Sequence, residues 1–379
     1  MVDILGISRT PICALLGSLS KTSAAKLGAV SLMKAIGMSF IKSDSIDNLV
    51  LSQVFSAGCG PLISKQIALW AGLDRLNTFQ VNQQCTSGLK ATVLAFDAIN
   101  SGKSQLTAVV GAESSSLAPY LLRKARYGGY GFGDGTLVDT LSRDGPRDIQ
   151  EEMENLAKSS NISKFEQDQY VLESFKRAAC CYSEGIMKHE IAPITVKTEQ
   201  PSKGTKAWIQ HKDCTISEDS FLRFVDFKNS KVDNNAKHSD GAASLIISTE
   251  NFTRRANLSP VARILDYRQV SGTFPESICD AIQGVKTTIN NPEKSVDLYD
   301  IMDQNAVVPL YISKRMDIDL SRMNICGSTI ALGHPPGMTG VRQIISLVTA
   351  LKSRGLQFGI AAGSNTHGEA TAILVESCT

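Results

Sequence analysis

The stretch VNQQCTSGLKATVLAFDAINSG, Val81 to Gly102, contains a sharp change of pattern at Cys85. Polar residues precede the cysteine, and apolar residues at helical spacing follow it. We therefore expect a turn that ends at Cys85 and a helix that runs to about Ser101. The start of a helix favours a thiolate, because free backbone N–H groups and the helix dipole stabilise negative charge there. Most cysteines are simply small buried side chains, so position alone leaves both interpretations open.

A second stretch has the same organisation. The motif HPPG, which begins at His334, precedes an apolar helical segment and then a predicted strand, FGIAAGSN. The helix after Cys85 is likewise followed by a predicted strand, LTAVVGAES, and each half closes on a further strand, SDGAASLIIS (239–248) or HGEATAILVE (367–376). Two copies of one α/β unit would place Cys85 and His334 at corresponding helix starts.

Length and composition exclude several function classes. The chain has 379 residues, 42% of them hydrophobic, and a formal net charge of only +2, so nothing predicts binding to nucleic acid or to a membrane surface. The opening residues, MVDILGISRTPI, lack the pattern of a signal peptide. The nine cysteines are scattered without a CxxC pair, which argues against disulfides or a metal site and for a reducing compartment. We expect a cytoplasmic enzyme without a bound metal.

The stretch from about Pro119 to Ser230 differs in composition from its flanks. It begins with a glycine-rich loop, ARYGGYGFGDGTLVD, continues through a polar helical segment and ends in a charged, turn-rich region. A loop of that length needs structure of its own, so we interpret it as an insertion. The predicted division is a first half (1–118 and 231–250), an inserted loop domain (119–230) and a second half (251–379).

Several of these motifs together resemble the thiolase family. The motifs are RTPI (9–12), VNQQCTSGLKA (81–91), GAESSSLAPYLLRKARYG (111–128), GDGTLVD (133–139), SDGAA (239–243) and IALGHPPGMTG (330–340). They span nearly the whole chain in the family's order. The resemblance implies a five-layered αβαβα fold of two similar βαβαβαββ halves, with a loop domain that covers coenzyme A. It also implies a homodimer or homotetramer, because ARYGGYGFGDG is similar to the tetramerisation loop of bacterial biosynthetic thiolases.

The activity that the resemblance implies is acyl transfer between coenzyme A thioesters. A thiolate attacks the thioester carbonyl, and hydrogen-bond donors hold the oxyanion that develops. Carbon–carbon bond formation then needs a base that removes a proton from acetyl-CoA. We expect acetyl-CoA or a short 3-ketoacyl-CoA as the substrate, and no separate cofactor.

By resemblance, Cys85 is the nucleophile and its backbone N–H donates to the oxyanion. Ser87 and Gly88 are expected to allow a tight backbone approach beside the substrate. His334, in a constrained turn after Gly333, is expected to activate Cys85 and to donate to an oxyanion, and Gly333 itself is an expected substrate contact.

The segments that contact coenzyme A in the family are less well matched. The family's Asn-Ala-Ser-Gly segment corresponds to Asn235-Ala236-Lys237, so Ala236 and Lys237 are the expected substrate contacts. A His-Met-Gly segment would fall at Asp148-Ile149-Gln150. The basic run LLRKAR (121–126) and Lys237 would suit nucleotide phosphates, although a charge run is more often a solvated surface.

Two catalytic positions depart from the family. The asparagine of the Asn-Glu-Ala-Phe motif is replaced by Met302, whose thioether accepts hydrogen bonds weakly and donates none. Asn305 or Asp303 would take over only if the local backbone differs. The acid/base cysteine of the C-terminal motif is replaced by Ser364, and a serine hydroxyl is a poor base at neutral pH unless another group activates it. His367 is either a substitute base or a surface histidine.

These departures leave alternatives to a full thiolase. One is an acyl-CoA hydrolase or other acyltransferase that keeps Cys85 and His334 but lacks efficient Claisen chemistry. Another is a non-catalytic protein that binds an acyl-CoA or a partner. The cysteine helix and the GHP turn favour an enzyme.

Overall fold

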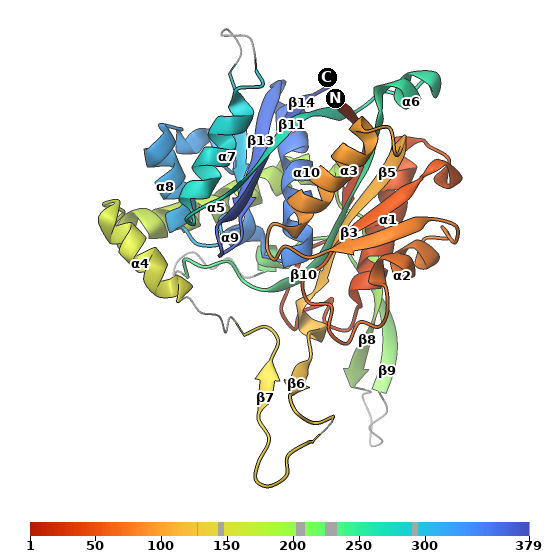
Figure 1. Ribbon diagram of the computed structural model, residues 1–379, viewed down its shortest axis with the longest axis vertical. Helices are drawn as coiled ribbons and strands as arrows, with labels where there is room; N and C mark the ends of the chain where they lie inside the picture. Colours follow the sequence, from red (N-terminus) through yellow and green to blue (C-terminus); the bar gives the residue numbers. More distant parts are fainter. Residues whose placement is uncertain (127, 143–147, 202–208, 224–232, 290–294, 379) are drawn as a thin grey trace.

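The computed structural model describes residues 1–126, 128–142, 148–201, 209–223, 233–289 and 295–378. Strands form its centre and helices lie on both sides, while a thin hairpin extends from the body (Figure 1). Among the described residues, we find no helix that is both long and apolar enough to cross a bilayer.

The first half forms one sheet in the order β4-β3-β5-β10-β1, in which β3 runs parallel to β4 and β5 while β10 is antiparallel to β5 and β1. The predicted helix after Cys85 and the predicted strands on either side of the insertion are confirmed. The elements are β1 (Val2–Arg9), β2 (Cys13–Ala14), α1 (Ala24–Ser39), β3 (Asn48–Ser52), α2 (Ile63–Trp70), β4 (Asn77–Val81), α3 (Ser87–Asn100), β5 (Leu106–Ser114), β10 (Ser239–Thr249) and α6 (Glu250–Arg255).

The second half repeats this topology. Its strands lie in the order β12-β13-β14-β11, with β12 parallel to β13 and the other pairs antiparallel. One difference corrects the expected βαβαβαββ pattern: in the described residues, the third strand is reduced to a single parallel bridge between Tyr299 and Met323. The elements are β11 (Ala262–Ser271), α7 (Glu276–Lys286), β12 (Leu298–Ile301), α8 (Val307–Met316), α9 (Thr329–Leu332), α10 (Pro336–Arg354), β13 (Phe358–Ser364) and β14 (Glu369–Ser377).

The two halves stack into five layers, as predicted. Helices α1 and α2 cover the outer face of the first sheet, α7 covers the outer face of the second, and α3 and α10 lie between the sheets (Figure 1). The sheets also meet at one edge, because Val2–Ile4 of β1 pair with Ala262–Ile264 of β11. In the described residues, the result is one hydrogen-bonded sheet of ten strands, nine in a continuous order and β2 paired beside β10, rather than two separate sheets.

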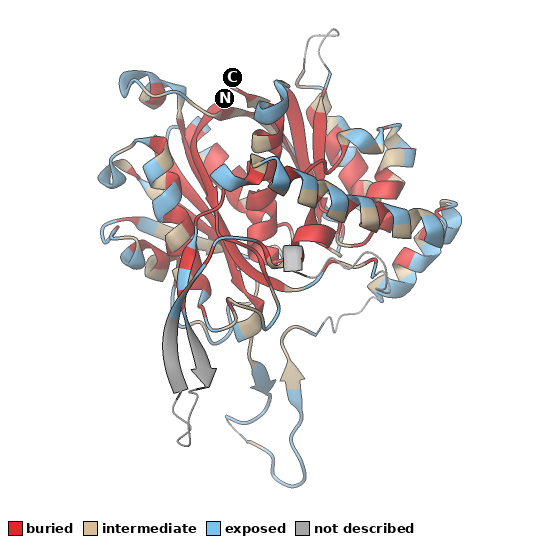
Figure 2. Cartoon of the chain, turned by 180° about the vertical axis from the view of Figure 1, so that it is seen from behind, coloured by how far each residue is buried: buried red, intermediate tan, exposed pale blue. Residues whose placement is uncertain are grey.

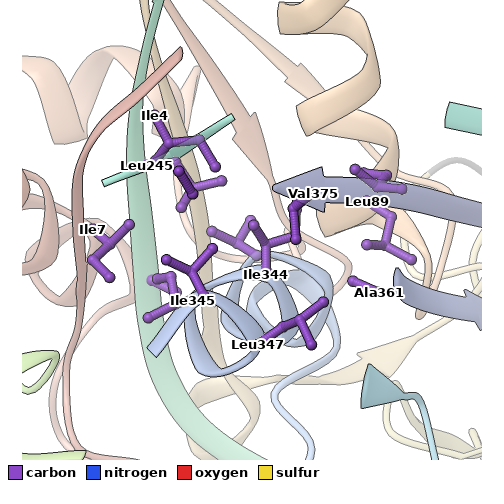
Figure 3. Close-up of a cluster of buried hydrophobic side chains, with 14 of the residues drawn as sticks. Ile4, Ile7, Leu89, Leu245, Ile344, Ile345, Leu347, Ala361 and Val375 are labelled. Atoms are coloured by element: carbon purple, nitrogen blue, oxygen red, sulfur yellow. The ribbon is translucent and has the colours of Figure 1, made fainter. Parts of the chain in front are cut away.

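Helix α10 is the centre of the core. Its apolar residues Ile344, Ile345 and Leu347 lie among side chains from both sheets and from α3 (Figure 3). The buried colour runs through this middle layer in Figure 2. A helix that is buried all round belongs between two layers, and this position fixes where its N-terminus, next to His334, emerges.

Between β5 and β10, the described residues of the insertion form two hairpins and two α-helices. Its elements are β6 (Tyr120–Leu122), β7 (Leu137–Asp139), α4 (Ile149–Ser159), α5 (Lys164–Ser183), β8 (Ile194–Pro201) and β9 (Ile209–Ile216). A fully buried Arg9 of β1 binds Glu190 at 2.6 Å and Asp219 at 2.8 Å, which ties the insertion to the first sheet. The β6–β7 hairpin instead extends into solvent (Figure 1).

Candidate active site

Cys85 lies on a tight turn two residues before α3. Gln84 has a φ of 52°, in the left-handed region, and this reverses the chain just before the cysteine. The Ser87 hydroxyl accepts from the Gln83 N–H at 2.8 Å and donates to the Gln84 carbonyl at 2.5 Å, which holds the turn closed. Cys85 is half-buried in this position.

His334 approaches Cys85 from the second half of the chain. Its Nε2 lies 3.2 Å from the Cys85 Sγ, and its Nδ1 lies 2.8 Å from the Thr339 hydroxyl. The Thr339 hydroxyl donates its one proton to the Pro335 carbonyl, at 3.0 Å. The imidazole therefore donates through Nδ1–H, which leaves the lone pair of Nε2 facing the thiol. This is the arrangement that a general base needs.

Two glycine contacts explain why the helix starts meet. A Cβ on Gly88 of α3 would stand 2.7 Å from the Val341 nitrogen of α10, and a Cβ on Gly340 would stand 2.4 Å from the Leu89 nitrogen. The two helices thus cross with their backbones in contact. Gly88 is accounted for by this packing, and its expected contact with substrate remains a prediction.

The turn that presents His334 also depends on glycine. Gly333 has a φ of 106°, and a Cβ there would lie 2.4 Å from the Ser239 hydroxyl. The His334 backbone N–H donates to the Lys237 carbonyl at 2.8 Å. The backbone of His334 is therefore held by Lys237, and its imidazole is held by Thr339.

Glu113, at the end of β5, is a site residue that the sequence reasoning missed. Its buried carboxylate accepts from the backbone N–H groups of Val54, Phe55 and Gly337 at 2.9–3.1 Å. Gly337 is the second residue of α10, so Glu113 holds the helix start against the first sheet. Burial raises the pKa of Glu113 to about 7, although the three N–H groups oppose this shift. A buried acid inside LTAVVGAES was the available sequence signal.

The residues that depart from the family lie at the ends of β12 and β13. Met302 is buried, and its side chain packs on Gly363, where a Cβ would meet it at 2.8 Å. The Ser364 hydroxyl donates to the Asn365 carbonyl at 2.8 Å and lies 3.5 Å from the Ser277 hydroxyl. In the described part of the chain, no basic side chain contacts the Ser364 hydroxyl.

The two suggested replacements for the missing asparagine are engaged elsewhere. Asp303 accepts from the Tyr170 hydroxyl at 3.0 Å and from the Ile330 N–H at 3.2 Å, and burial raises its pKa to about 6. The Asn305 amide donates to Asn235 at 2.9 Å. Neither contact directs a donor toward Met302.

Gln304, which the sequence reasoning passed over, does reach that position. Its Nε2 donates to the Ser364 carbonyl at 2.9 Å and lies 3.4 Å from the Met302 Sδ. Its backbone carbonyl accepts from the Ala236 N–H at 2.9 Å. Gln304 thus touches three of the predicted site positions at once.

His367 lies on the turn between β13 and β14 and is exposed. Its Nδ1 lies 3.1 Å from the Gln84 Oε1, so the residue next to Cys85 is its partner. His367 and Gln84 line a hollow of about 380 Å³ together with Val81, Asn82, Gln83, Lys90, Asn365 and Glu369. The role of substitute base remains a prediction for His367.

Two of the segments expected to contact coenzyme A meet at one cavity, and the third does not. Gln150 of α4 and Asn235 both line a cavity of about 650 Å³ that also includes Asn305 and Lys164. Ala236 is buried beside this cavity, whereas the exposed Lys237 pairs with Asp233. The run 121–126 is exposed on the β6–β7 hairpin. No cluster of three or more potential metal ligands (His, Cys, Asp or Glu) occurs within the described ranges.

Comparison with known proteins identifies the family. Family models for the thiolase N-terminal domain and the thiolase C-terminal domain match residues 2–251 and 258–377. The chain is 33% identical to acetyl-CoA acetyltransferase IB of Candida tropicalis, over 99% of this chain and 97% of that protein. It is 32% identical to mitochondrial acetyl-CoA acetyltransferase B of Xenopus laevis, over 99% and 91%.

Solved structures give the same result. An acetyl-CoA acetyltransferase from Syntrophomonas wolfei superposes with a TM-score of 0.88 at 28% identity, covering 100% of this chain and 99% of that one. A thiolase from Ascaris suum in complex with coenzyme A gives 0.87 at 28% identity, with full coverage of both chains. The chain therefore belongs to the thiolase family.

Proposed function

We propose that this protein is a thiolase-type acyltransferase that forms an acyl-cysteine at Cys85. The observation that carries the proposal is the 3.2 Å approach of His334 Nε2 to the Cys85 Sγ, with Thr339 fixing the tautomer. Acetyl-CoA or a short 3-ketoacyl-CoA is the substrate, and the thioester enters as a reactant with no separate cofactor.

The first half-reaction uses groups that are already in place. His334 Nε2 takes the thiol proton, and the Cys85 sulfur bonds to the thioester carbonyl carbon. The carbonyl oxygen becomes an oxyanion, which backbone N–H groups at the cysteine turn stabilise. When the oxyanion collapses, the bond to the coenzyme A sulfur breaks, and the proton held by His334 passes to that sulfur.

The second half-reaction lacks the thiol base that the family has at position 364. Removal of a proton from acetyl-CoA needs a base at position 364, and the Ser364 hydroxyl donates its own proton to a carbonyl. The relatives named above are acetyltransferases and thiolases, which favours the acyltransferase over a non-catalytic binder. Slow Claisen chemistry with intact acylation is the expected behaviour.

The test separates the two half-reactions. The protein is mixed with acetyl-CoA or acetoacetyl-CoA, and the Cys85 adduct is followed by intact mass and peptide mapping. Thiolysis and condensation are assayed separately by coenzyme A release and consumption. An adduct is expected, and its absence with both thioesters would overturn the proposal.

We infer that the pantetheine arm of coenzyme A passes along the cavity lined by Gln150 and Asn235. The chemistry supports this, because residues with side-chain amides, among them Gln150, Asn235 and Asn305, line the cavity. Filling the cavity with Gln150→Trp should raise the KM for acetyl-CoA about tenfold while kcat stays within twofold. An unchanged KM would show that the pantetheine arm binds elsewhere.

We propose that the chain assembles into a homodimer or homotetramer through a surface that includes the β6–β7 hairpin. Large apolar side chains are exposed along it, and Phe132 is fully exposed. Such a patch is typical of an interaction site. Light scattering of Phe132→Ser against the parent chain tests this, and an unchanged mass of the assembly would rule the hairpin out.

We propose a cytoplasmic location. All nine cysteines are free thiols, which suits a reducing compartment. Some relatives are named as mitochondrial, so cell fractionation is the decisive measurement. Recovery in the mitochondrial fraction would contradict the proposal.

A further inference from the structure

Two buried cysteines lie against each other outside the candidate active site. Cys181 belongs to α5, and Cys326 belongs to the segment that precedes α9. Their thiols are hydrogen-bonded to one another. A buried cysteine is most often a small apolar side chain, but two thiols in contact can also be oxidised to a disulfide.

The contact belongs to a longer interface between α5 and residues 324–328. At one end of this interface, the Asn324 amide donates to the Tyr170 hydroxyl of α5 at 2.8 Å. At the other end, the Cys181 thiol donates to the Ile325 carbonyl at 3.6 Å. The segment therefore follows the buried face of the helix, which is formed by Tyr170, Val171, Ser174, Ala178 and Cys181.

Gly327 allows the segment to approach α5 closely. Its φ is 71°, and a Cβ there would stand 2.8 Å from the Ala178 Cβ and 2.9 Å from the Ser174 carbonyl oxygen. Cys326 therefore lies between two residues that contact the helix, Ile325 and Gly327. Because the backbone is held on both sides of Cys326, its sulfur is kept next to that of Cys181.

The two thiols differ in acidity. The hydrogen bond from Cys326 lowers the pKa of Cys181, although burial and the charge of Glu184 oppose this shift. The same hydrogen bond, together with burial, raises the pKa of Cys326 well above its ordinary value. Cys181 is therefore the thiol that ionises and attacks an oxidant, and Cys326 is the neighbour that can complete a disulfide.

The pair lies close to the surface of the molecule. Cys180, the preceding residue of α5, is exposed. Its own thiol donates to Glu184 at 3.1 Å, and this hydrogen bond raises the pKa of Cys180. A small oxidant that approaches this side of α5 therefore meets a poorly ionised thiol at Cys180 and a more acidic one at Cys181.

We propose that Cys181 and Cys326 form a site of reversible oxidation, at which a peroxide converts the two thiols into a disulfide that links α5 to the segment before α9. This inference goes beyond the proposed acyl transfer and does not depend on it. The disulfide closes a long stretch of chain, which restricts the unfolded state, so oxidation should stabilise the folded protein.

The chemistry needs only hydrogen peroxide as the oxidant. The Cys181 thiolate attacks one peroxide oxygen, the O–O bond breaks, and the departing hydroxide takes up the thiol proton to become water. The Cys326 sulfur then attacks the sulfenic sulfur of Cys181. The S–S bond forms, and the hydroxyl group leaves with the Cys326 proton as a second water. Two thiols and one peroxide thus give one disulfide and two waters.

The test uses the full chain with Cys85→Ala, so that the proposed nucleophile does not consume peroxide. After hydrogen peroxide and blocking of the remaining thiols, peptide mapping without reductant should find Cys181 joined to Cys326. The melting temperature should rise by about 3–6 °C and return to its starting value with dithiothreitol. Cys180 and Cys181 share one tryptic peptide, so Cys180→Ala in the same background is the matched control and should form the same cross-link.

Two further variants, Cys181→Ala and Cys326→Ala in the Cys85→Ala background, should lose both the cross-link and the rise in melting temperature. If either variant folds poorly, mapping of the chain that retains both cysteines still decides the result. No cross-link under excess peroxide would overturn the inference. A cross-link that forms only in urea, or that is lost in Cys180→Ala, would also overturn it. A cross-link without a rise in melting temperature would overturn the stabilising effect.

Discussion

The two helix starts and the two strand ends of this protein contrast in how far they follow the family. Cys85 before α3 and His334 before α10 keep the expected residues and meet at 3.2 Å. The ends of β12 and β13, at Met302 and Ser364, carry replacements. The turn after Ser364 approaches the cysteine turn, since the Asn365 amide lies 3.5 Å from the Gln83 carbonyl.

The contrast separates two chemical tasks. In the proposed mechanism, the helix starts supply the nucleophile and the base for acylation, and the backbone crossing at Gly88 and Gly340 brings the two helices into contact. The strand ends carry the two positions that the resemblance assigns to groups of the family's catalytic site. A chain can thus retain the first task while the second changes, because different elements position the two sets of side chains.

The largest expected effect is at the cysteine itself. Cys85→Ala should abolish the acyl adduct and reduce turnover by at least about 10³-fold, because no other group replaces a covalent nucleophile. The melting temperature should change little, since Cys85 is only half-buried. Cys180→Ala, an exposed cysteine on α5, is the control. An adduct that persists in Cys85→Ala would assign the nucleophile to another residue.

The stabilising effect of Glu113, which binds the N-terminus of α10, should depend on pH. The pKa of Glu113 is raised from 4.5 to about 7 in the folded protein, so folding favours its protonated form. Its contribution to the free energy of unfolding is fully present below about pH 4.5 and falls by about 3 kcal/mol as the pH rises to about 7.

The measurement compares urea unfolding of the parent and Glu113→Gln between pH 4.5 and 8. The variant carries a constant cost, because a glutamine NH₂ would face backbone N–H groups, but it should lack the pH-dependent loss. The difference in unfolding free energy between the two proteins should therefore shrink as the pH rises. Parallel curves would show that Glu113 stays ionised throughout.

Loss of the contact that fixes the His334 tautomer should lower the acylation rate by a smaller factor than loss of Cys85. Thr339→Val keeps the shape but removes the acceptor for Nδ1–H, and acylation should slow by about 10- to 50-fold. Thr349→Val, on the same helix, removes a hydroxyl bonded to Glu190 and should leave the acylation rate within twofold. Equal losses in the two variants would point to general damage to α10 rather than to the imidazole.

The strand ends provide the smallest and most specific change. Ser364→Cys should raise thiolysis about tenfold without altering the acylation rate, since a thiol ionises far more readily than a hydroxyl. Ser364→Ala should acylate like the parent. No gain in Ser364→Cys would indicate that Met302 or the coenzyme A site, rather than the base, limits the second step.

Much of this architecture could be predicted from residue patterns. The helical spacing after Cys85 and after HPPG, and the small-residue strands between them, predicted the repeat with its two corresponding helix starts, and the family resemblance predicted that His334 acts on Cys85. The family motifs extended this to five layers. The third strand of the second half was not predictable, because its reduction to a bridge at Met323 depends on pairing across the sheet rather than on local pattern.

The remaining site residues could not be predicted from the sequence. Glu113, Gln304 and Thr339 act through contacts with residues that are distant in sequence or through the direction of one side chain. Motif spacing locates Met302 as a replacement, but it does not show that the amide of Gln304 lies beside it. Nor does the sequence show that Gly88 serves the crossing of two helices.

The separation of Cys85 and His334 along the chain has a consequence for folding. They are 249 residues apart, and the contacts that position them draw on both halves and on Lys237, in the segment that follows the insertion. Contacts of such long range form late, after each half has built its own sheet. During refolding, reactivity toward acetyl-CoA should therefore return after secondary structure does. A newly made chain passes through its aggregation-prone stages with its nucleophile still unpaired with its base.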